Sequence, residues 1–187
     1  MSKGRLFVFS GASGVGKSTV LSKVMSLRQD LRFSVSATTR APRPGEVEAV
    51  NYYFVTKDQF EEMIRQNAFV EYDAHMDNYY GTPKAQLDEK LQVGSVILDI
   101  EPNGALNVKK QCPDAVLIFI APPSDKELER RLRSRGDTSE EQIALRLDRV
   151  KWEVAQSDKY DYVVVNDQVD TCVNEIINII ENKLEEI

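Results

Sequence analysis

Short apolar runs recur along the chain and alternate with longer stretches of mixed polarity. The runs occupy residues 5–10, 96–100, 116–120 and 162–165. The intervals between them can hold crossover helices, and this arrangement is typical of a parallel sheet covered on both faces. The pattern therefore predicts an α/β fold in three layers, with helices on either side of a central parallel sheet.

Helical periodicity fills several of the intervals. Val20, Leu21 and Val24 have helical spacing, and Ser124 with Glu127 has the spacing of a capping box before a helix that we expect to end at Gly136. A further helix is predicted from residue 138 or 139 to about residue 152. The last predicted helix carries an apolar stripe, best explained by packing on the core, at Val173, Ile176, Ile177, Ile180 and Leu184.

Between residues 33 and 92 the pattern changes to short segments of alternating apolar and polar residues around one predicted helix at residues 56–66. This segment is too short for a domain with a large core of its own, so we interpret it as a small mixed β/α lobe inserted into the main fold. We predict a single domain over residues 1–187, with a core of residues 1–32, 93–124 and 151–187, the inserted lobe at 33–92 and a helical lid at 125–150.

Composition narrows the class of protein. The chain has 187 residues, is 42% hydrophobic and 29% charged, and contains no apolar run long enough to span a bilayer. Its beginning lacks the pattern of a signal peptide, so we expect a cytoplasmic protein without a membrane partner. Cys112, Cys172 and the single His75 are too scattered for a disulfide framework or a structural metal site. The net charge of −6 argues against nucleic-acid binding. The oligomeric state stays open.

The segment after the first apolar run matches the phosphate-binding pattern G-x-x-x-x-G-K-[ST], followed at once by helical spacing. Glycines let successive backbone N–H groups enclose phosphate oxygens, and the helix N-terminus favours an anion. We expect Lys17 to reach the β- and γ-phosphates of a nucleoside triphosphate and Ser18 to ligate Mg²⁺. A chance glycine turn with a solvated lysine is the alternative. The expected residues of this nucleotide-binding loop are Gly11, Ala12, Ser13, Gly14, Val15, Gly16, Lys17, Ser18 and Thr19.

Asp99 lies near the end of the apolar run at residues 96–100 and is the second candidate ligand for Mg²⁺. The carboxyl ends of parallel strands share one edge of a sheet, so the sequence predicts that Asp99 lies beside the phosphate-binding loop. The alternative role is a cap for a helix that starts after Pro102. These features suit an ATPase, a GTPase or a kinase, although the guanine-reading N-K-x-D tetrad of common GTPases is absent from the sequence.

Candidate residues for a second anionic ligand lie in the inserted lobe. Arg40 and Arg43 stand three residues apart in a Pro- and Gly-rich segment, and arginine forks match phosphate oxygens. Two tyrosine pairs follow, at residues 52–53 and 79–80. Solvated loop charge and half-buried strand packing are the ordinary alternatives for these arginines and tyrosines. Thr82, before Pro83, is interpreted as a helix N-cap and as a possible ligand contact.

At this point the sequence resembles the guanylate kinases. The segments "SGASGVGKST", "FSVSATTRAPRPGE", "FVEY", "NYYGT", "LDI", "FIAPPS", "RLRSRG" and "YDYVVVND" occur in that family's order and cover the chain nearly end to end. The resemblance implies ATP and GMP as substrates, with the GMP-binding site in the inserted lobe. It implies that Arg40, Arg43, Tyr52 and Tyr80 hold the phosphate of GMP and that Ser36, Glu71 and Thr82 read guanine.

Glu71 suits guanine on chemical grounds as well. Guanine presents N1–H and its 2-amino group side by side, and a carboxylate offers two acceptors to these two donors. Adenine has an acceptor at N1, which would leave the carboxylate desolvated and unpaired. An exposed strand glutamate is the alternative interpretation.

The chain departs from the family pattern in two places. Glu101 stands where an aspartate is common, and we expect its longer side chain to reach the guanine edge. The loop "EVEAVNYY" lacks a glycine that is usual between the glutamate and the tyrosine.

The segment "ERRLRSRGDTSEEQIALRLDR" concentrates arginines in an otherwise acidic chain, although such runs usually form solvated helix faces. The resemblance implies that Arg131, Arg135 and Arg146 close over ATP and that Asn166 contacts adenine. A phosphate monoester needs no catalytic base near neutrality, so transfer depends on charge compensation and alignment. We expect the catalytic residues to be Lys17, Arg40, Arg135, Arg146 and Asp99. A catalytically silent scaffold domain and a kinase for another phosphorylated acceptor are the alternatives.

Overall fold

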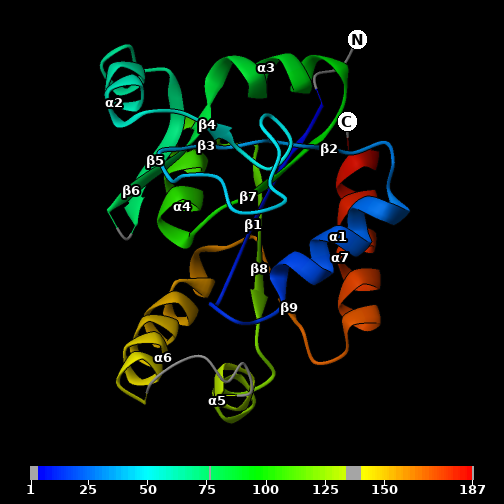
Figure 1. Cartoon of the computed structure of the whole chain (residues 1–187). Helices are drawn as coiled ribbons and strands as arrows, with labels where there is room; N and C mark the ends of the chain where they lie inside the picture. The colour runs from blue at the N-terminus through cyan, green and yellow to red at the C-terminus, as the bar shows by residue number, and fades with distance from the viewer. Residues whose placement is uncertain (1–3, 76, 134–139, 187) are drawn as a thin grey trace. The chain divides into compact units, whose positions relative to one another are not determined.

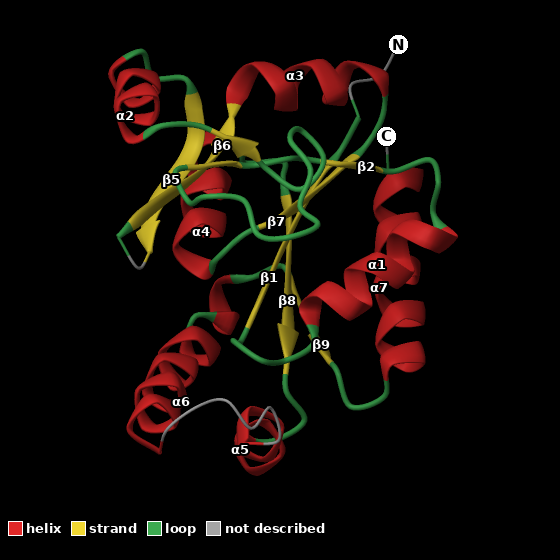
Figure 2. Cartoon of the chain, in the orientation of Figure 1, coloured by secondary structure: helices red, strands yellow, loops and turns green. Residues whose placement is uncertain are grey.

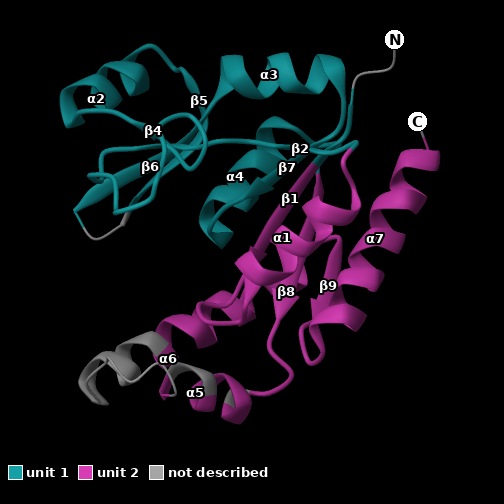
Figure 3. Cartoon of the chain, turned by 45° about the vertical axis from the view of Figure 1, so that its right-hand side comes forward, with its two compact units in different colours: residues 1–6, 30–115 teal, residues 7–29, 116–187 magenta. Residues whose placement is uncertain are grey.

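A computed structural model describes residues 4–75, 77–133 and 140–186 of the chain (Figure 1). The description omits the side chains of residues 75, 125, 131, 132 and 140–146. The chain divides into two compact units (Figure 3). Unit 1 contains residues 30–115 with the N-terminal segment up to Leu6, and unit 2 contains residues 7–29 and 116–187.

Unit 2 contains the phosphate-binding loop and three parallel strands. Strands β1 (Leu6–Gly11), β8 (Val116–Ala121) and β9 (Tyr162–Val165) pair in that order, with Phe7 opposite Val116 and Ile118 opposite Tyr162. Every residue of β1 is buried, and only the last residue of β8 is partly exposed. Burial on both faces explains why β1 and β8 are apolar runs rather than alternating ones, whereas β9 is partly exposed.

The helices of unit 2 are α1 (Lys17–Leu27), α5 (Asp125–Arg133), α6 (Glu140–Ala155) and α7 (Val169–Glu185), with a short 3₁₀ turn at Ser157–Lys159. Helices α1 and α7 pack together (Figure 2), and ion pairs join Lys23 to Asp170 and Arg28 to Glu181. Ser124 accepts a hydrogen bond from the backbone N–H of Glu127, so the expected cap of α5 is present. The predicted helix end at Gly136 lies outside the described residues.

Unit 1 contains a parallel strand pair and a separate mixed sheet. Strands β2 (Arg32–Phe33) and β7 (Val96–Asp99) pair in parallel. The mixed sheet has the order β4 (Tyr53–Phe54), β3 (Ala37–Thr38), β6 (Asn78–Pro83) and β5 (Phe69–His75). Its β3–β4 pair is parallel and its other pairs are antiparallel. This sheet confirms the mixed strand content predicted for the inserted segment.

Three helices complete unit 1: α2 (Lys57–Arg65), α3 (Lys84–Val93) and α4 (Pro102–Gln111). Thr56 and Gln59 form a full capping box at the start of α2, which satisfies backbone donors that would otherwise lack partners. Phe60 of α2 stacks on Phe69 with ring centroids 4.4 Å apart and on Tyr79 at 5.2 Å. Helix α4 packs on β5, which brings the start of α4 next to the residues expected to read guanine.

The parallel strands, the flanking helices and the second, mixed sheet confirm the predicted α/β class. Among the described residues, no helix has the length and apolar character needed to cross a bilayer.

Candidate functional site

The phosphate-binding loop has the backbone that its sequence pattern predicts. Strand β1 ends at Gly11 and helix α1 begins at Lys17, with Gly14 at φ 83° and Gly16 at φ 92°. Both glycines are in the left-handed region, which other residues adopt only with strain. Gly11 serves a different purpose, because a Cβ atom there would lie 2.6 Å from the carbonyl oxygen of Ile120. The glycines thus let the loop turn tightly and let its base approach β8.

Two buried side chains hold this loop in place. The amide Nδ2 of Asn166 donates to the carbonyl oxygen of Val15 at 2.8 Å, and Asn166 is 3% exposed. The carboxylate of Glu153, 1% exposed, accepts the backbone N–H of Ser13 at 2.8 Å and Nε of Arg149 at 2.9 Å. Asn166, expected at adenine, therefore contacts the loop backbone in this structure.

Glu153 is a residue that the sequence analysis missed. It lies in α6 four residues after Arg149, with the spacing of an ordinary exposed ion pair, and the local sequence does not distinguish it from the solvated glutamates nearby. Its partner Ser13 lies 140 residues earlier in the chain. Only the folded structure reveals that this carboxylate is buried and bonded to the phosphate-binding loop.

Lys17, Ser18 and Thr19 form the first turn of α1, where their backbone N–H groups lack partners within the helix. Lys17 is partly buried and the other two side chains are exposed. Asp99 ends β7 in unit 1, whereas the loop belongs to unit 2, so a shared Mg²⁺ site of Ser18 and Asp99 stays a prediction. The alternative role of Asp99 is not supported, because the N-cap of α4 is Glu101.

The arginine-rich segment is only partly described. Arg135 lies outside the described residues, as do the side chains of Arg131 and Arg146. Two neighbouring arginines of α5 make surface ion pairs instead. Arg130 binds Glu127 at 2.7 Å and Arg133 binds Glu129 at 2.9 Å. For these two residues the ordinary interpretation, a solvated helix face, is correct.

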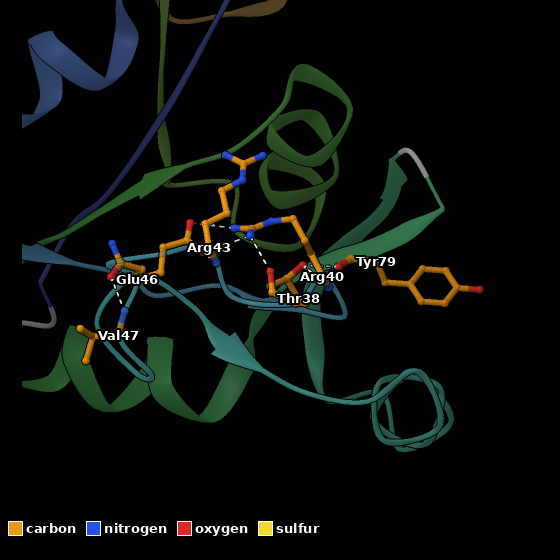
Figure 4. Close-up of polar contacts among 8 residues, drawn as sticks. Thr38, Arg40, Arg43, Glu46, Val47 and Tyr79 are labelled. Carbon is orange, nitrogen blue, oxygen red and sulfur yellow. Dashed lines mark hydrogen bonds and ion pairs between the residues drawn. The ribbon is translucent and has the colours of Figure 1, made fainter.

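Arg40 is the centre of a polar cluster in unit 1 (Figure 4). Its Nη1 and Nη2 atoms donate to the two carboxylate oxygens of Glu46 at 3.0 and 2.8 Å, and Nη1 also donates to the carbonyl oxygen of Ala41. The pairing with Arg40, assisted by the backbone N–H of Arg43, lowers the pKa of Glu46. A planar fork that now holds a carboxylate has the geometry to hold a phosphate.

Tyr52 and Tyr80 lie beside the same guanidinium. The rings of Tyr52 and Tyr80 meet edge to face with centroids 6.0 Å apart, and the guanidinium of Arg40 lies 5.4 Å from the Tyr52 ring centroid. Burial raises the pKa of Tyr52, and the nearby Tyr80 raises it further. The Tyr52 hydroxyl therefore stays protonated near neutrality and can donate a hydrogen bond to an anionic oxygen. The structure thus brings together Arg40, Tyr52 and Tyr80.

Arg43 contributes its backbone to this cluster, since its N–H donates to Glu46 at 2.7 Å, and its side chain is exposed. Six residues further on, Ala49 adopts φ 61°, in the left-handed region. Ala49 belongs to the loop in which the family's usual glycine is missing. The unusual loop sequence therefore keeps a left-handed backbone at a position where the Cβ atom causes strain.

Glu71 and Thr82 form a buried pair across β5 and β6. They are 7% and 0% exposed, and the Thr82 hydroxyl donates to Oε1 of Glu71 at 2.6 Å. Burial raises the pKa of Glu71 to about 7, although the Thr82 hydrogen bond lowers it and the charge of Asp73 raises it. The expected helix cap at Thr82 is wrong: Thr82 is a strand residue, the N-cap of α3 is Pro83, and the Thr82 hydroxyl binds Glu71 instead.

The remaining candidates for guanine recognition lie on neighbouring segments of unit 1. Ser36 directly precedes β3, is partly buried, and accepts the backbone N–H of Tyr53 through its carbonyl oxygen at 2.9 Å. Glu101 is exposed at the N-cap of α4, the helix that packs on β5. A second residue of this helix start, Gly104, is in contact with Glu71 and was missed by the sequence analysis.

A phosphate-binding loop between a buried parallel strand and a helix defines a protein of the P-loop nucleotide-binding class. The family model of guanylate kinases matches residues 3–183. The chain is 49% identical over 179 residues to a guanylate kinase of Thermus thermophilus, covering 95% of this chain and 81% of that protein. It is 50% identical over 182 residues to a guanylate kinase of Streptococcus thermophilus, covering 96% and 87%.

A solved structure is also similar. The crystal structure of guanylate kinase from Anaplasma phagocytophilum matches with a TM-score of 0.78 and 32% identity, covering 97% of this chain and 87% of that one. The chain belongs to the guanylate kinase family, whose members are nucleotide-binding kinases.

Proposed function

We propose that this chain transfers the γ-phosphate of ATP to GMP and releases ADP and GDP, with the donor held by unit 2 and the acceptor by unit 1. Family membership supports ATP-dependent phosphorylation of GMP in nucleotide metabolism. The observation that carries the assignment of the acceptor is the buried Glu71–Thr82 pair, because a desolvated carboxylate is selective for a base with two adjacent donors.

On the donor side, we assign the triphosphate to the loop from Gly11 to Thr19. The backbone N–H groups at the start of α1 and the cationic Lys17 compensate the charge of the β- and γ-phosphates. Asn166 keeps the loop in shape and Arg131 is assigned to ATP. Mg²⁺ prefers oxygen ligands, so the Ser18 hydroxyl and the Asp99 carboxylate are suitable to hold it. Bound Mg²⁺ would supply a charge that neutralises phosphate oxygens.

On the acceptor side, we assign the GMP phosphate to Arg40, Arg43, Tyr52 and Tyr80. Arg40 already binds a carboxylate with both terminal nitrogens, so the phosphate either displaces Glu46 or binds beside it. The tyrosine hydroxyls donate further hydrogen bonds. This cluster therefore offers the cationic groups and the hydrogen-bond donors that a phosphate dianion requires.

The guanine base is assigned to Glu71, assisted by Ser36, Thr82 and Glu101. The Thr82 hydroxyl donates a hydrogen bond to Oε1 of Glu71 and so helps to orient the carboxylate. Guanine N1–H and the 2-amino group then complete the hydrogen bonding of the carboxylate. Adenine would leave a buried charge unpaired, which costs roughly 1–3 kcal/mol or more.

The chain's residues perform transfer by positioning and charge compensation. The attacking phosphate of GMP has a second pKa of about 6 and needs no base. Lys17, Arg40 and the lid arginines Arg135 and Arg146 offset the negative charge of the two substrates and of the transferred group. We assign residues 125–150 to a lid that excludes water, and residues 33–92 to the acceptor lobe. We further propose that the enzyme works in the cytoplasm without a membrane or nucleic-acid partner.

A coupled assay of ADP release tests the proposal. GMP, AMP, UMP and CMP are offered side by side with ATP and magnesium, and only GMP should be turned over efficiently. Glu71→Gln should lose most GMP turnover relative to any residual AMP activity while ATP binding is kept, because the amide presents a donor where guanine also presents one. Lys17→Ala serves as the folded, inactive control. An equal loss for GMP and AMP in Glu71→Gln would remove guanine recognition from Glu71.

A further inference from the structure

Gly104 lies in the first turn of α4 directly against the carboxylate of Glu71. A Cβ atom at this position would lie 2.6 Å from Oε2 and 3.2 Å from Cδ of Glu71, and 3.3 Å from Cδ1 of Ile100. Approaches under 3.0 Å essentially never occur for real Cβ atoms. The absence of a side chain at residue 104 is therefore what lets the helix backbone and this carboxylate come so close.

The carboxylate is the part that would have to move if residue 104 carried a side chain. Gly104 is held in a helix that packs on β5, whereas the clashing atom is the end of a side chain. Glu71 is nevertheless not free to move without loss, because its other oxygen accepts the Thr82 hydroxyl at 2.6 Å. Thr82 on Oε1 and the Gly104 backbone beside Oε2 together fix the carboxylate plane.

We propose that Gly104 is a positioning residue for guanine recognition, which keeps both oxygens of Glu71 aligned with the two donors of the base. This proposal rests on the proposed function, in which Glu71 reads guanine. A carboxylate pushed away from α4 would lose its bond to Thr82 or present only one oxygen to guanine. Helix α4 thereby determines specificity through the shape of its backbone as well as through the charge of Glu101 at its N-cap.

Gly104→Ala is the direct test. Alanine favours a helix interior over glycine, so the substitution does not weaken α4 through backbone propensity. We expect KM for GMP to rise about 10- to 100-fold, the effect of losing one hydrogen bond to a charged group. KM for ATP should stay unchanged, and kcat at saturating GMP should fall less than kcat/KM. The matched control is Gly94→Ala, because Gly94 has extended backbone at φ 163° and its Cβ would meet no atom closer than 3.4 Å.

A double-variant cycle separates positioning from a general structural effect. The Glu71→Ala variant lacks the clashing carboxylate. The double variant with Gly104→Ala should therefore have the same KM for GMP as Glu71→Ala alone. If Gly104→Ala alone failed to fold, as judged by circular dichroism, the double variant should fold normally. A double variant that also failed to fold, or that raised KM for GMP above that of Glu71→Ala, would overturn the proposal.

The outcomes also distinguish this inference from the function on which it rests. If Glu71→Ala raises KM for GMP and Gly104→Ala does not, Glu71 reads guanine but Gly104 does not position it. If Glu71→Ala leaves KM for GMP unchanged, the assignment of Glu71 itself is wrong and the role of Gly104 falls with it.

Discussion

The raised pKa of Glu71, together with its proposed role in guanine recognition, predicts that this residue contributes to the pH dependence of GMP affinity. Burial raises the pKa of the Glu71 carboxyl to about 7 in the protein without nucleotide. Guanine N1–H and the 2-amino group need two acceptor oxygens, which only the ionised carboxylate provides. With guanine bound to Glu71 as we propose, GMP binding must release the proton from Glu71 wherever the carboxyl is protonated beforehand.

The magnitude follows from the ionised fraction. With a pKa of about 7, roughly one carboxyl in eleven is ionised at about pH 6, and roughly ten in eleven at about pH 8. The dissociation constant for GMP should therefore be about 10-fold higher at pH 6 than at pH 8 from Glu71 alone. At about pH 7, binding should release roughly half a proton.

Isothermal titration calorimetry of GMP in buffers of different ionisation enthalpy measures both quantities. The phosphate of GMP also titrates, with a second pKa of about 6, so the comparison must be made with Glu71→Ala. That variant keeps the titration of the phosphate and loses the contribution of Glu71. Wild type and Glu71→Ala with the same pH dependence and the same proton release would refute the reasoning.

Two further predictions concern a buried contact and a backbone conformation. Glu153→Gln should raise KM for ATP about 10-fold and leave KM for GMP unchanged, because a single amide oxygen cannot accept from both Ser13 and Arg149. Initial rates with each substrate varied in turn measure both constants, and an unaltered KM for ATP would contradict the prediction. Ala49→Gly should increase the free energy of unfolding by about 0.5–1 kcal/mol, since glycine accepts the φ of 61° without strain; urea denaturation measures this, and a less stable variant would show that the strain at Ala49 is negligible.

Local patterns were sufficient to predict much of the fold. The apolar runs at β1, β7 and β8 are strands, because a strand buried on both faces must be apolar throughout, and the run at β9 is a strand although part of it is exposed. The phosphate-binding loop followed from a short pattern whose glycines have direct backbone reasons. In each of these cases the sequence signal lies within a few consecutive residues, even where the strand pairing itself joins distant parts of the chain.

The contacts that the sequence did not reveal join residues far apart in the chain. Thr82 was interpreted from its neighbour Pro83 as a cap, but its hydroxyl binds Glu71 eleven residues away across two strands. Glu153 has the local spacing of an exposed ion pair, yet it is buried against the loop at Ser13. A glycine such as Gly104 gives no signal of its own, because its role is to leave space for another residue's side chain.

The burial of the Glu71 carboxyl also affects the stability of the fold, in a way that depends on pH. An unfolded glutamate has a pKa near 4.5, and the folded value is about 7, so the folded chain holds an extra proton between these pH values. The contribution of Glu71 to stability is therefore most favourable below about pH 4.5 and is lost as the pH rises through 7, by about 3 kcal/mol in total. At neutral and higher pH a residue of similar size without charge would stabilise the fold more. The same desolvation makes an unpaired carboxylate costly, so the selectivity for guanine over adenine that we propose for Glu71 is tied to a loss of stability.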